Sequence, residues 1–282
     1  MMDDKALPRN RAARGVYLMA RRYVSHNVSA QSAALAFYFL FTLFPLTIFF
    51  SSLIGLLRLD QGSILSDLSG LLPGEVVEFI QMYLEYVDEN SSVKLLMFGL
   101  VFSLYFPMRA TNSLMRAVRT AYHLGPSRTP VRTMLKTLVY TVLLIVTIVA
   151  VLVLLTVGEW LLGCAVDRFG LPAELAGIWK RLRFPVMALL MYFALYLLYA
   201  ITQDTWQPQR NIWPGVLFAM AGWMVVSMCY SFYVENIASY SLLYGSIGTA
   251  IVVLMWLNLT ATVLIMGGEL NGMLIALRRE KE

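Results

Sequence analysis

Six long apolar stretches, each nearly free of charge, dominate the pattern of hydrophobic and polar positions along this chain. They cover residues 33–57, 93–110, 137–161, 184–203, 214–234 and 245–266. A helix needs about 20 apolar residues to cross the hydrocarbon core of a bilayer, and apolar runs of this length indicate helices rather than strands. The pattern therefore predicts an all-α fold, a polytopic transmembrane helical bundle of six spans.

The composition agrees with a membrane protein. Of the 282 residues, 59% are hydrophobic and 14% are charged, whereas charged residues make up about a quarter of an ordinary soluble domain. Six spans with their connections account for the whole length. We therefore predict a single six-span membrane domain over residues 1–282.

The basic residues predict the orientation. Residues 1–32, 109–136, 204–213 and 276–282 hold 6, 6, 1 and 3 of the 22 Lys and Arg, and the opposite side holds the other 6. Because positive charge accumulates on the cytoplasmic side, both termini are expected in the cytoplasm.

Three amphipathic segments accompany the spans. A basic N-terminal segment, residues 8–30, and an outer loop, residues 60–92, flank the first span, and the loop could gate the bundle or simply cover it. The third segment, a cytoplasmic amphipathic helix over residues 109–122, places Arg109, Arg116 and Arg119 on one side. These arginines either serve topology alone or bind anionic lipid head groups.

Three stretches carry a family resemblance. They are the run Ser-Ala-Ala-Leu-Ala-Phe-Tyr-Phe-Leu-Phe-Thr-Leu-Phe-Pro at residues 32–45, the segment 109–122, and residues 240–271 with Tyr-Gly-Ser, Trp256 and Gly-Glu-Leu-Asn. In these stretches the chain resembles the YihY/BrkB family of bacterial inner-membrane proteins. The resemblance implies six spans in a cell inner membrane and a transport or envelope role.

Members of that family have also carried the label of a transfer-RNA-processing ribonuclease. A metal-dependent nuclease needs clustered His, Asp and Glu ligands, but the only two histidines, His26 and His123, are far apart in sequence. No Cys-x-x-Cys pair or Walker-type loop is present either. We therefore predict no enzyme, catalytic residue, metal site, cofactor or nucleic-acid partner, and we expect both cysteines to be buried.

An acid inside a span is costly and suggests function. Glu269 lies near the cytoplasmic end of the sixth stretch and shares one helical face with Asn258 and Thr262. Such a stripe either lines a polar pathway or makes hydrogen bonds between helices. A cation, such as the basic segment around Arg109, could pair with Glu269.

Two further stripes follow helical spacing. The fourth stretch aligns four polar-tipped residues, Tyr192, Tyr196, Tyr199 and Gln203, which either extend the pathway or pack against a neighbouring helix. The fifth carries Gly215, Ala219 and Gly222, a small-residue face that predicts close helix packing.

These features favour a transporter or lipid-handling protein of the cell envelope. Its expected partners are membrane lipids, anionic phospholipid among them. The alternative is a non-transporting envelope scaffold or assembly factor whose polar stripes only hold the bundle together.

Overall fold

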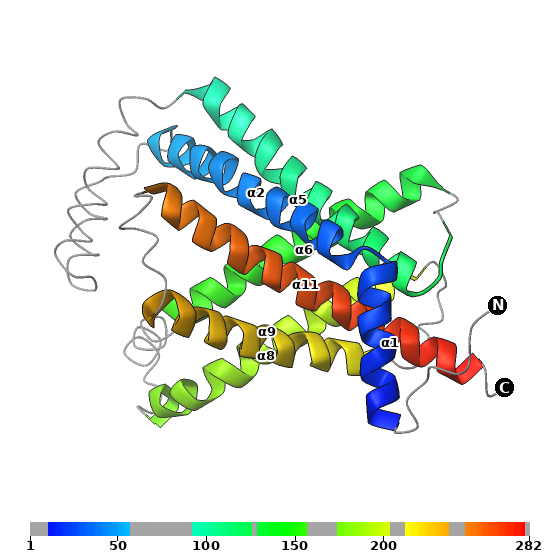
Figure 1. Cartoon of the computed structure of the whole chain (residues 1–282). Helices are drawn as coiled ribbons and strands as arrows, with labels where there is room; N and C mark the ends of the chain where they lie inside the picture. Colours follow the sequence, from blue (N-terminus) through cyan, green and yellow to red (C-terminus); the bar gives the residue numbers. More distant parts are fainter. Residues whose placement is uncertain are drawn as a thin grey trace. The chain divides into compact units, whose positions relative to one another are not determined.

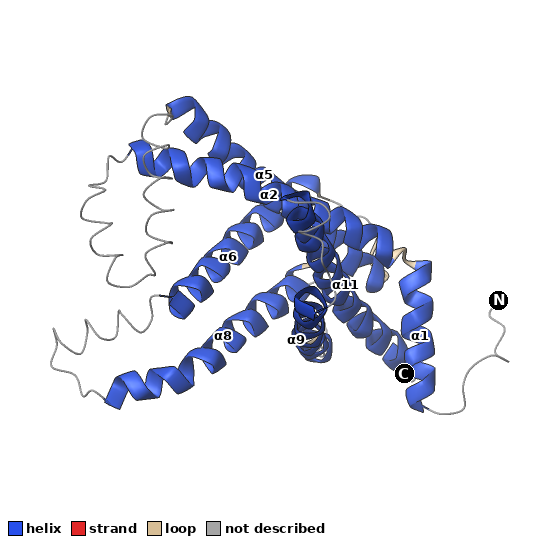
Figure 2. Cartoon of the chain, turned by 60° about the vertical axis from the view of Figure 1, so that its left-hand side comes forward, coloured by secondary structure: helices blue, strands red, loops and turns tan. Residues whose placement is uncertain are grey.

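The computed structural model describes residues 11–56, 92–125, 129–156, 174–203, 212–236 and 246–279. These residues form seven helices and no strand (Figures 1 and 2). The helices are α1 (Arg11–Ser25), α2 (Val28–Leu56), α5 (Val93–Ala121), α6 (Pro130–Thr156), α8 (Glu174–Ile201), α9 (Trp213–Asn236) and α11 (Ser246–Arg279). The predicted outer amphipathic loop lies outside the described residues, apart from Ser92.

Six of these helices are long and apolar enough to cross a membrane, which confirms the predicted all-α class and six spans. Some bounds differ from the prediction. The second apolar stretch and the amphipathic segment 109–122 form one helix, α5, because no Gly or Pro follows Pro107 before the helix ends. Likewise, α11 continues past the predicted end of its span to Arg279.

The chain divides into two compact units, residues 37–110 and a larger unit of residues 1–36 and 111–282. In the smaller unit, aromatic side chains of α2 and α5 pack together, with the Phe41 and Phe106 rings 5.8 Å apart. Gly99 lies directly against the backbone of Phe49, where a side chain would collide. The prediction of a single domain over residues 1–282 stays a prediction.

In the larger unit, α9 packs against α11 through small residues. A Cβ atom added at Gly215 would collide with the carbonyl oxygen of Gly267, and one added at Gly267 would lie 2.9 Å from the Cβ of Ala219. Gly222 lies against Val263 of α11. The predicted small-residue face is thus confirmed as a helix contact, because only residues this small allow the two backbones to approach so closely.

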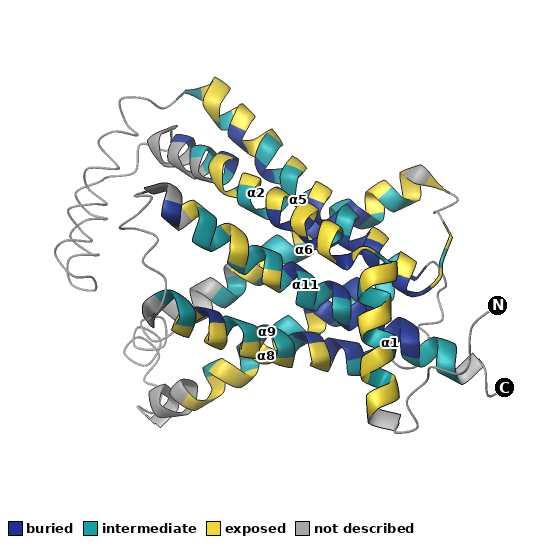
Figure 3. Cartoon of the chain, in the orientation of Figure 1, coloured by how far each residue is buried: buried dark blue, intermediate teal, exposed yellow. Residues whose placement is uncertain are grey.

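Burial in the larger unit is concentrated at one end of its helices. The buried residues of α6, α8, α9 and α11 fall in the halves near α1, apart from Tyr230, Gly248 and Ala261 (Figure 3). We call this the terminal end, because α1 and the end of α11 both lie there (Figure 1). Elsewhere the helices expose large apolar side chains, which suits a lipid solvent. Cys229 is among the exposed residues, so its expected burial was wrong, while Cys164 lies outside the described residues.

Candidate functional site

Two helices end at the terminal end in residues with left-handed backbone conformation. Asn27 has φ 50° in the turn between α1 and α2, and His123 has φ 54° just after α5. Asn and His adopt this conformation more readily than most side chains. These turns place the His26 and His123 rings edge to face, with centroids 5.8 Å apart. Two histidines far apart in sequence therefore meet.

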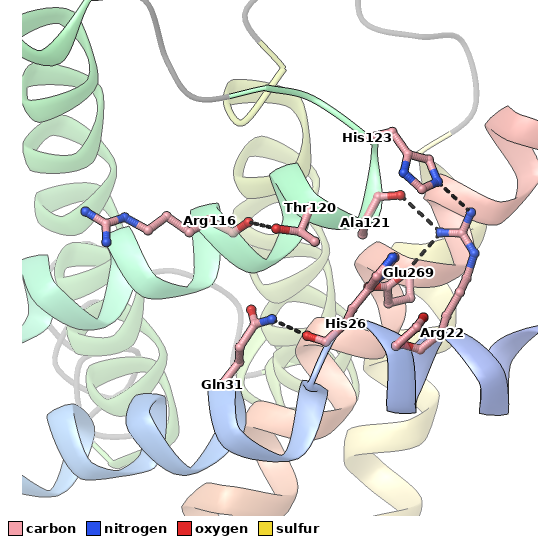
Figure 4. Close-up of polar contacts among 9 residues, drawn as sticks. Arg22, His26, Gln31, Arg116, Thr120, Ala121, His123 and Glu269 are labelled. Atoms are coloured by element: carbon pink, nitrogen blue, oxygen red, sulfur yellow. Dashed lines mark hydrogen bonds and ion pairs between the residues drawn. The ribbon is translucent and has the colours of Figure 1, made fainter.

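Glu269 of α11 lies beside these histidines and is fully buried. Its Oε2 lies 3.0 Å from Nη1 of Arg22, and its Oε1 lies 2.6 Å from Nδ1 of His26 (Figure 4). Both carboxylate oxygens thus have a nitrogen partner, the arrangement a buried acid requires to offset the loss of hydration. We call Arg22, His26, His123 and Glu269 the Glu269 cluster.

Arg22 extends the cluster to the end of α5. Its Nη1 also donates to the carbonyl oxygen of Ala121 at 3.1 Å, and its Nη2 lies 3.4 Å from Nε2 of His123 (Figure 4). Gly272 sits against the same Ala121 carbonyl, where any side chain would collide with the backbone and approach the guanidinium. One arginine therefore joins α1, α5 and α11.

A second buried polar group, Asn271, lies two residues beyond Glu269. Its Oδ1 accepts from the backbone N–H of Gly215, and its Nδ2 donates to the carbonyl oxygen of Ile212, both at 2.8 Å. The side chain thereby satisfies backbone groups at the start of α9. Its Nδ2 also lies 3.4 Å from the hydroxyl of Tyr122, and burial raises the pKa of Tyr122 well above its ordinary value.

Several buried polar side chains gather around these two groups. We call them the polar plug: Tyr122, Tyr199, Gln203, Glu269 and Asn271. Tyr199 donates to the carbonyl oxygen of Leu264 at 2.7 Å and so links α8 to α11. At the same terminal end, the hydroxyl of Tyr140 in α6 donates to the carbonyl oxygen of Ala194 in α8 at 3.0 Å.

The predicted pathway residues become more buried toward the polar plug. Tyr192, Tyr196, Asn258 and Thr262 are half-buried, whereas Tyr199, Gln203 and Glu269 are buried. The Tyr192 and Tyr196 rings stack on each other. Thr262 donates to the carbonyl oxygen of Asn258 within its own helix. Glu159, another acid within a predicted span, lies outside the described residues.

The three arginines predicted to bind lipid have different surroundings. Arg109 belongs to the smaller unit, where it stacks over Tyr38 and Tyr105. Arg119 donates to the carbonyl oxygens of Thr202 and Gly125, which holds the guanidinium against the protein. Arg116 is exposed.

The cation beside Glu269 is Arg22, whereas the sequence suggested the segment around Arg109. Sequence reasoning also set aside the two histidines because of their separation. A signal was nevertheless present. The positive-inside rule places residues 1–32, the end of α5 and the end of α11 on one side of the membrane, so Arg22, both histidines and Glu269 could have been grouped by side.

The Glu269 cluster is suited to holding a buried negative charge, because Arg22 and His26 each contact one carboxylate oxygen. The ring of His26 touches the carboxylate directly. Within the described ranges, no group of three or more His, Cys, Asp or Glu is arranged to hold a metal ion. The guanidinium of Arg22 occupies the position next to the Glu269 carboxylate that a metal cation would take.

Comparison with known proteins settles the family. A family model described as virulence factor BrkB matches residues 19–282. The chain belongs to the BrkB family. The matched range of this family member contains every residue of the Glu269 cluster and of the polar plug.

Two relatives of this chain carry different names. The chain is 31% identical over 253 residues to the ribonuclease-like protein YfkH of Bacillus subtilis, covering 90% of this chain and 92% of that one. It is 23% identical over 206 residues to a UPF0761 membrane protein of Aggregatibacter aphrophilus, covering 70% and 69%. No solved structure matches the chain.

Proposed function

We propose that this BrkB-family membrane protein moves lipid, or a small amphipathic solute, across a bacterial inner membrane with both termini in the cytoplasm. The supporting observation is the polar stripe whose burial increases toward Glu269. A lipid head group moving along half-buried Tyr192, Tyr196, Asn258 and Thr262 would keep polar contacts, while its acyl chains stay among the exposed apolar side chains. Such contacts lower the cost of bringing a polar group into hydrocarbon.

The polar plug would close this route at the cytoplasmic side. Its side chains are bonded across helices, by Tyr199 to Leu264 and by Asn271 to the start of α9. Movement to the cytoplasmic leaflet would therefore require the plug to loosen. Because Glu269 is bound to Arg22 and His26, a change of charge at this cluster is the step we propose for loosening it.

Transbilayer movement of phospholipid can be measured in vesicles that contain the purified protein and a trace of head-group-labelled fluorescent phospholipid. Dithionite bleaches only the label in the outer leaflet, so we expect more bleaching than in protein-free vesicles. Thr262→Val together with Asn258→Leu should slow the movement. Thr147→Val is a matched control, because its half-buried hydroxyl likewise bonds a carbonyl of its own helix. Bleaching equal to that of protein-free vesicles would contradict lipid movement.

A non-transporting envelope scaffold is the second candidate, and one observation favours it. Glu269 is paired on both oxygens, and the neighbouring polar side chains are bonded within the protein. The test is complementation of a strain that lacks the gene by the Glu269→Gln variant. If the protein is a scaffold, this variant should complement less well only as far as its abundance is lower. For a transporter, the same change should abolish complementation at normal abundance.

We also propose that the protein is not an enzyme. Among the described residues, Glu269 is the carboxylate paired with a histidine, and its oxygens are engaged by Arg22 and His26. The Glu269 cluster therefore does not provide the catalytic side chains that the ribonuclease-like name of the Bacillus subtilis relative would require. Purified protein should leave transfer-RNA precursors intact with and without added divalent metal ions.

A further inference from the structure

We propose that α1 binds the surface of an anionic phospholipid bilayer, with its apolar ridge toward the acyl chains and its basic edge toward the phosphates. The ridge is Val16, Ala20 and Val24, and the basic edge is Arg14 and Arg21. This inference does not depend on whether the protein moves lipid, because it concerns only the outward sides of α1.

The inward side of α1 is fixed by the protein. The helix packs against α11, and Arg22 on that side is bound to Glu269 at 3.0 Å. Leu18, Met19 and Tyr23 are half-buried on the same side. The rotation of α1 about its own axis is therefore set, which decides the residues that it presents outward.

The outward sides combine apolar and basic residues. Val16 is 72% exposed and Val24 is 73% exposed, and with Ala20 they follow a spacing of four that aligns them along one side of the helix. Arg14 and Arg21, seven residues apart, lie exposed on the adjoining side. The helix contains no acidic residue. An exposed apolar ridge beside arginines is typical of helices that lie in a membrane interface.

The position of α1 along the chain places it at the membrane surface. The first candidate span begins at Val28, directly after the turn at Asn27, so α1 cannot lie far from the boundary of the hydrocarbon. Anionic head groups complement its arginines in charge, and acyl chains complement the valine ridge. A second copy of the chain would carry the same positive charge and repel the basic edge.

Fluorescence from a label on the ridge tests this binding. Ala20→Cys would carry an environment-sensitive fluorophore in the full chain, with Cys164→Ser and Cys229→Ser to prevent other labelling. The protein would be placed in nanodiscs of phosphatidylcholine with increasing phosphatidylglycerol. We expect blue-shifted emission as the anionic fraction rises. Each arginine near an anionic surface strengthens association about fivefold, so Arg14→Gln with Arg21→Gln should weaken it by about 25-fold.

Arg132→Gln with Arg181→Gln is the matched control, because it removes the same charge from exposed residues of α6 and α8. This control should leave the emission unchanged. Water-like emission at every lipid composition would overturn the proposal, as would an equal effect of the control pair. Emission that depends on protein density at constant lipid composition would also overturn it, since a second copy would then cover the ridge.

Discussion

Nη1 of Arg22 lies 3.0 Å from Oε2 of Glu269, although 247 positions separate the two residues in the chain. This contact ties the helix that precedes the first span to the end of the last. The same guanidinium nitrogen bonds the carbonyl of Ala121 at the end of α5. One arginine therefore contacts both α5 and α11 at the terminal end of the larger unit.

Arg22→Met should destabilise the protein by about 3 kcal/mol, because it leaves the buried Glu269 carboxylate without its cation. Arg21→Met removes the same charge from an exposed neighbour and should change stability by less than about 0.5 kcal/mol. Thermal unfolding of both variants in detergent measures the difference. In the double variant with Glu269→Gln, the loss should be smaller than the sum of the single losses. Additive losses would mean that the pair contributes no coupling.

Gly272→Ala should destabilise the protein by about 1–3 kcal/mol, because the added methyl group collides with the Ala121 carbonyl and crowds Arg22. Gly15→Ala is the matched control. Nothing lies within 4 Å of a Cβ atom added there, so the helix should gain about 0.5–1 kcal/mol. The two melting temperatures should therefore move in opposite directions. An unchanged value for Gly272→Ala would argue against the close approach of α11 to the end of α5.

Asn271→Leu should cost about 2 kcal/mol or more, since it leaves the buried Gly215 N–H without its partner and removes one of the two donors to the Ile212 carbonyl. Asn258→Leu changes the same amide at a half-buried position of the same helix. It should cost less, and it should slow lipid movement if the stripe is a pathway. Denaturation of both variants, measured alongside vesicle transport, separates the structural asparagine from the pathway one. Equal stability losses would remove that distinction.

Cysteines at Asp3→Cys and Glu282→Cys should be protected from an impermeant thiol reagent in intact cells, whereas Asn90→Cys should react. The reason is the excess of Lys and Arg on the side of the termini. The background needs Cys164→Ala and Cys229→Ala, because a native cysteine could also react. Permeabilised cells provide the control, in which all three positions become accessible. Labelling of either terminus in intact cells would contradict a cytoplasmic location.

The sequence by itself determined the class of this protein and the number of its spans. Length and hydrophobicity of a run are local properties, and a run of about 20 apolar residues satisfies its backbone in lipid only as a helix. The small-residue face of α9 could also be predicted from local sequence, because Gly215 and Ala219 lie within one or two turns of each other. The BrkB resemblance agreed with the matched range of residues 19–282.

Only the tertiary structure decided the partners of Glu269. Helical periodicity gives the angle between residues on one helix, but it does not give the rotation of that helix relative to its neighbours. Arg21 and Arg22 are adjacent in sequence, yet one is exposed and the other bonds Glu269. The rotation that separates them follows from the packing of α1 on α11 and from the left-handed turn at Asn27. These long-range features determine which of several equivalent arginines pairs with the acid.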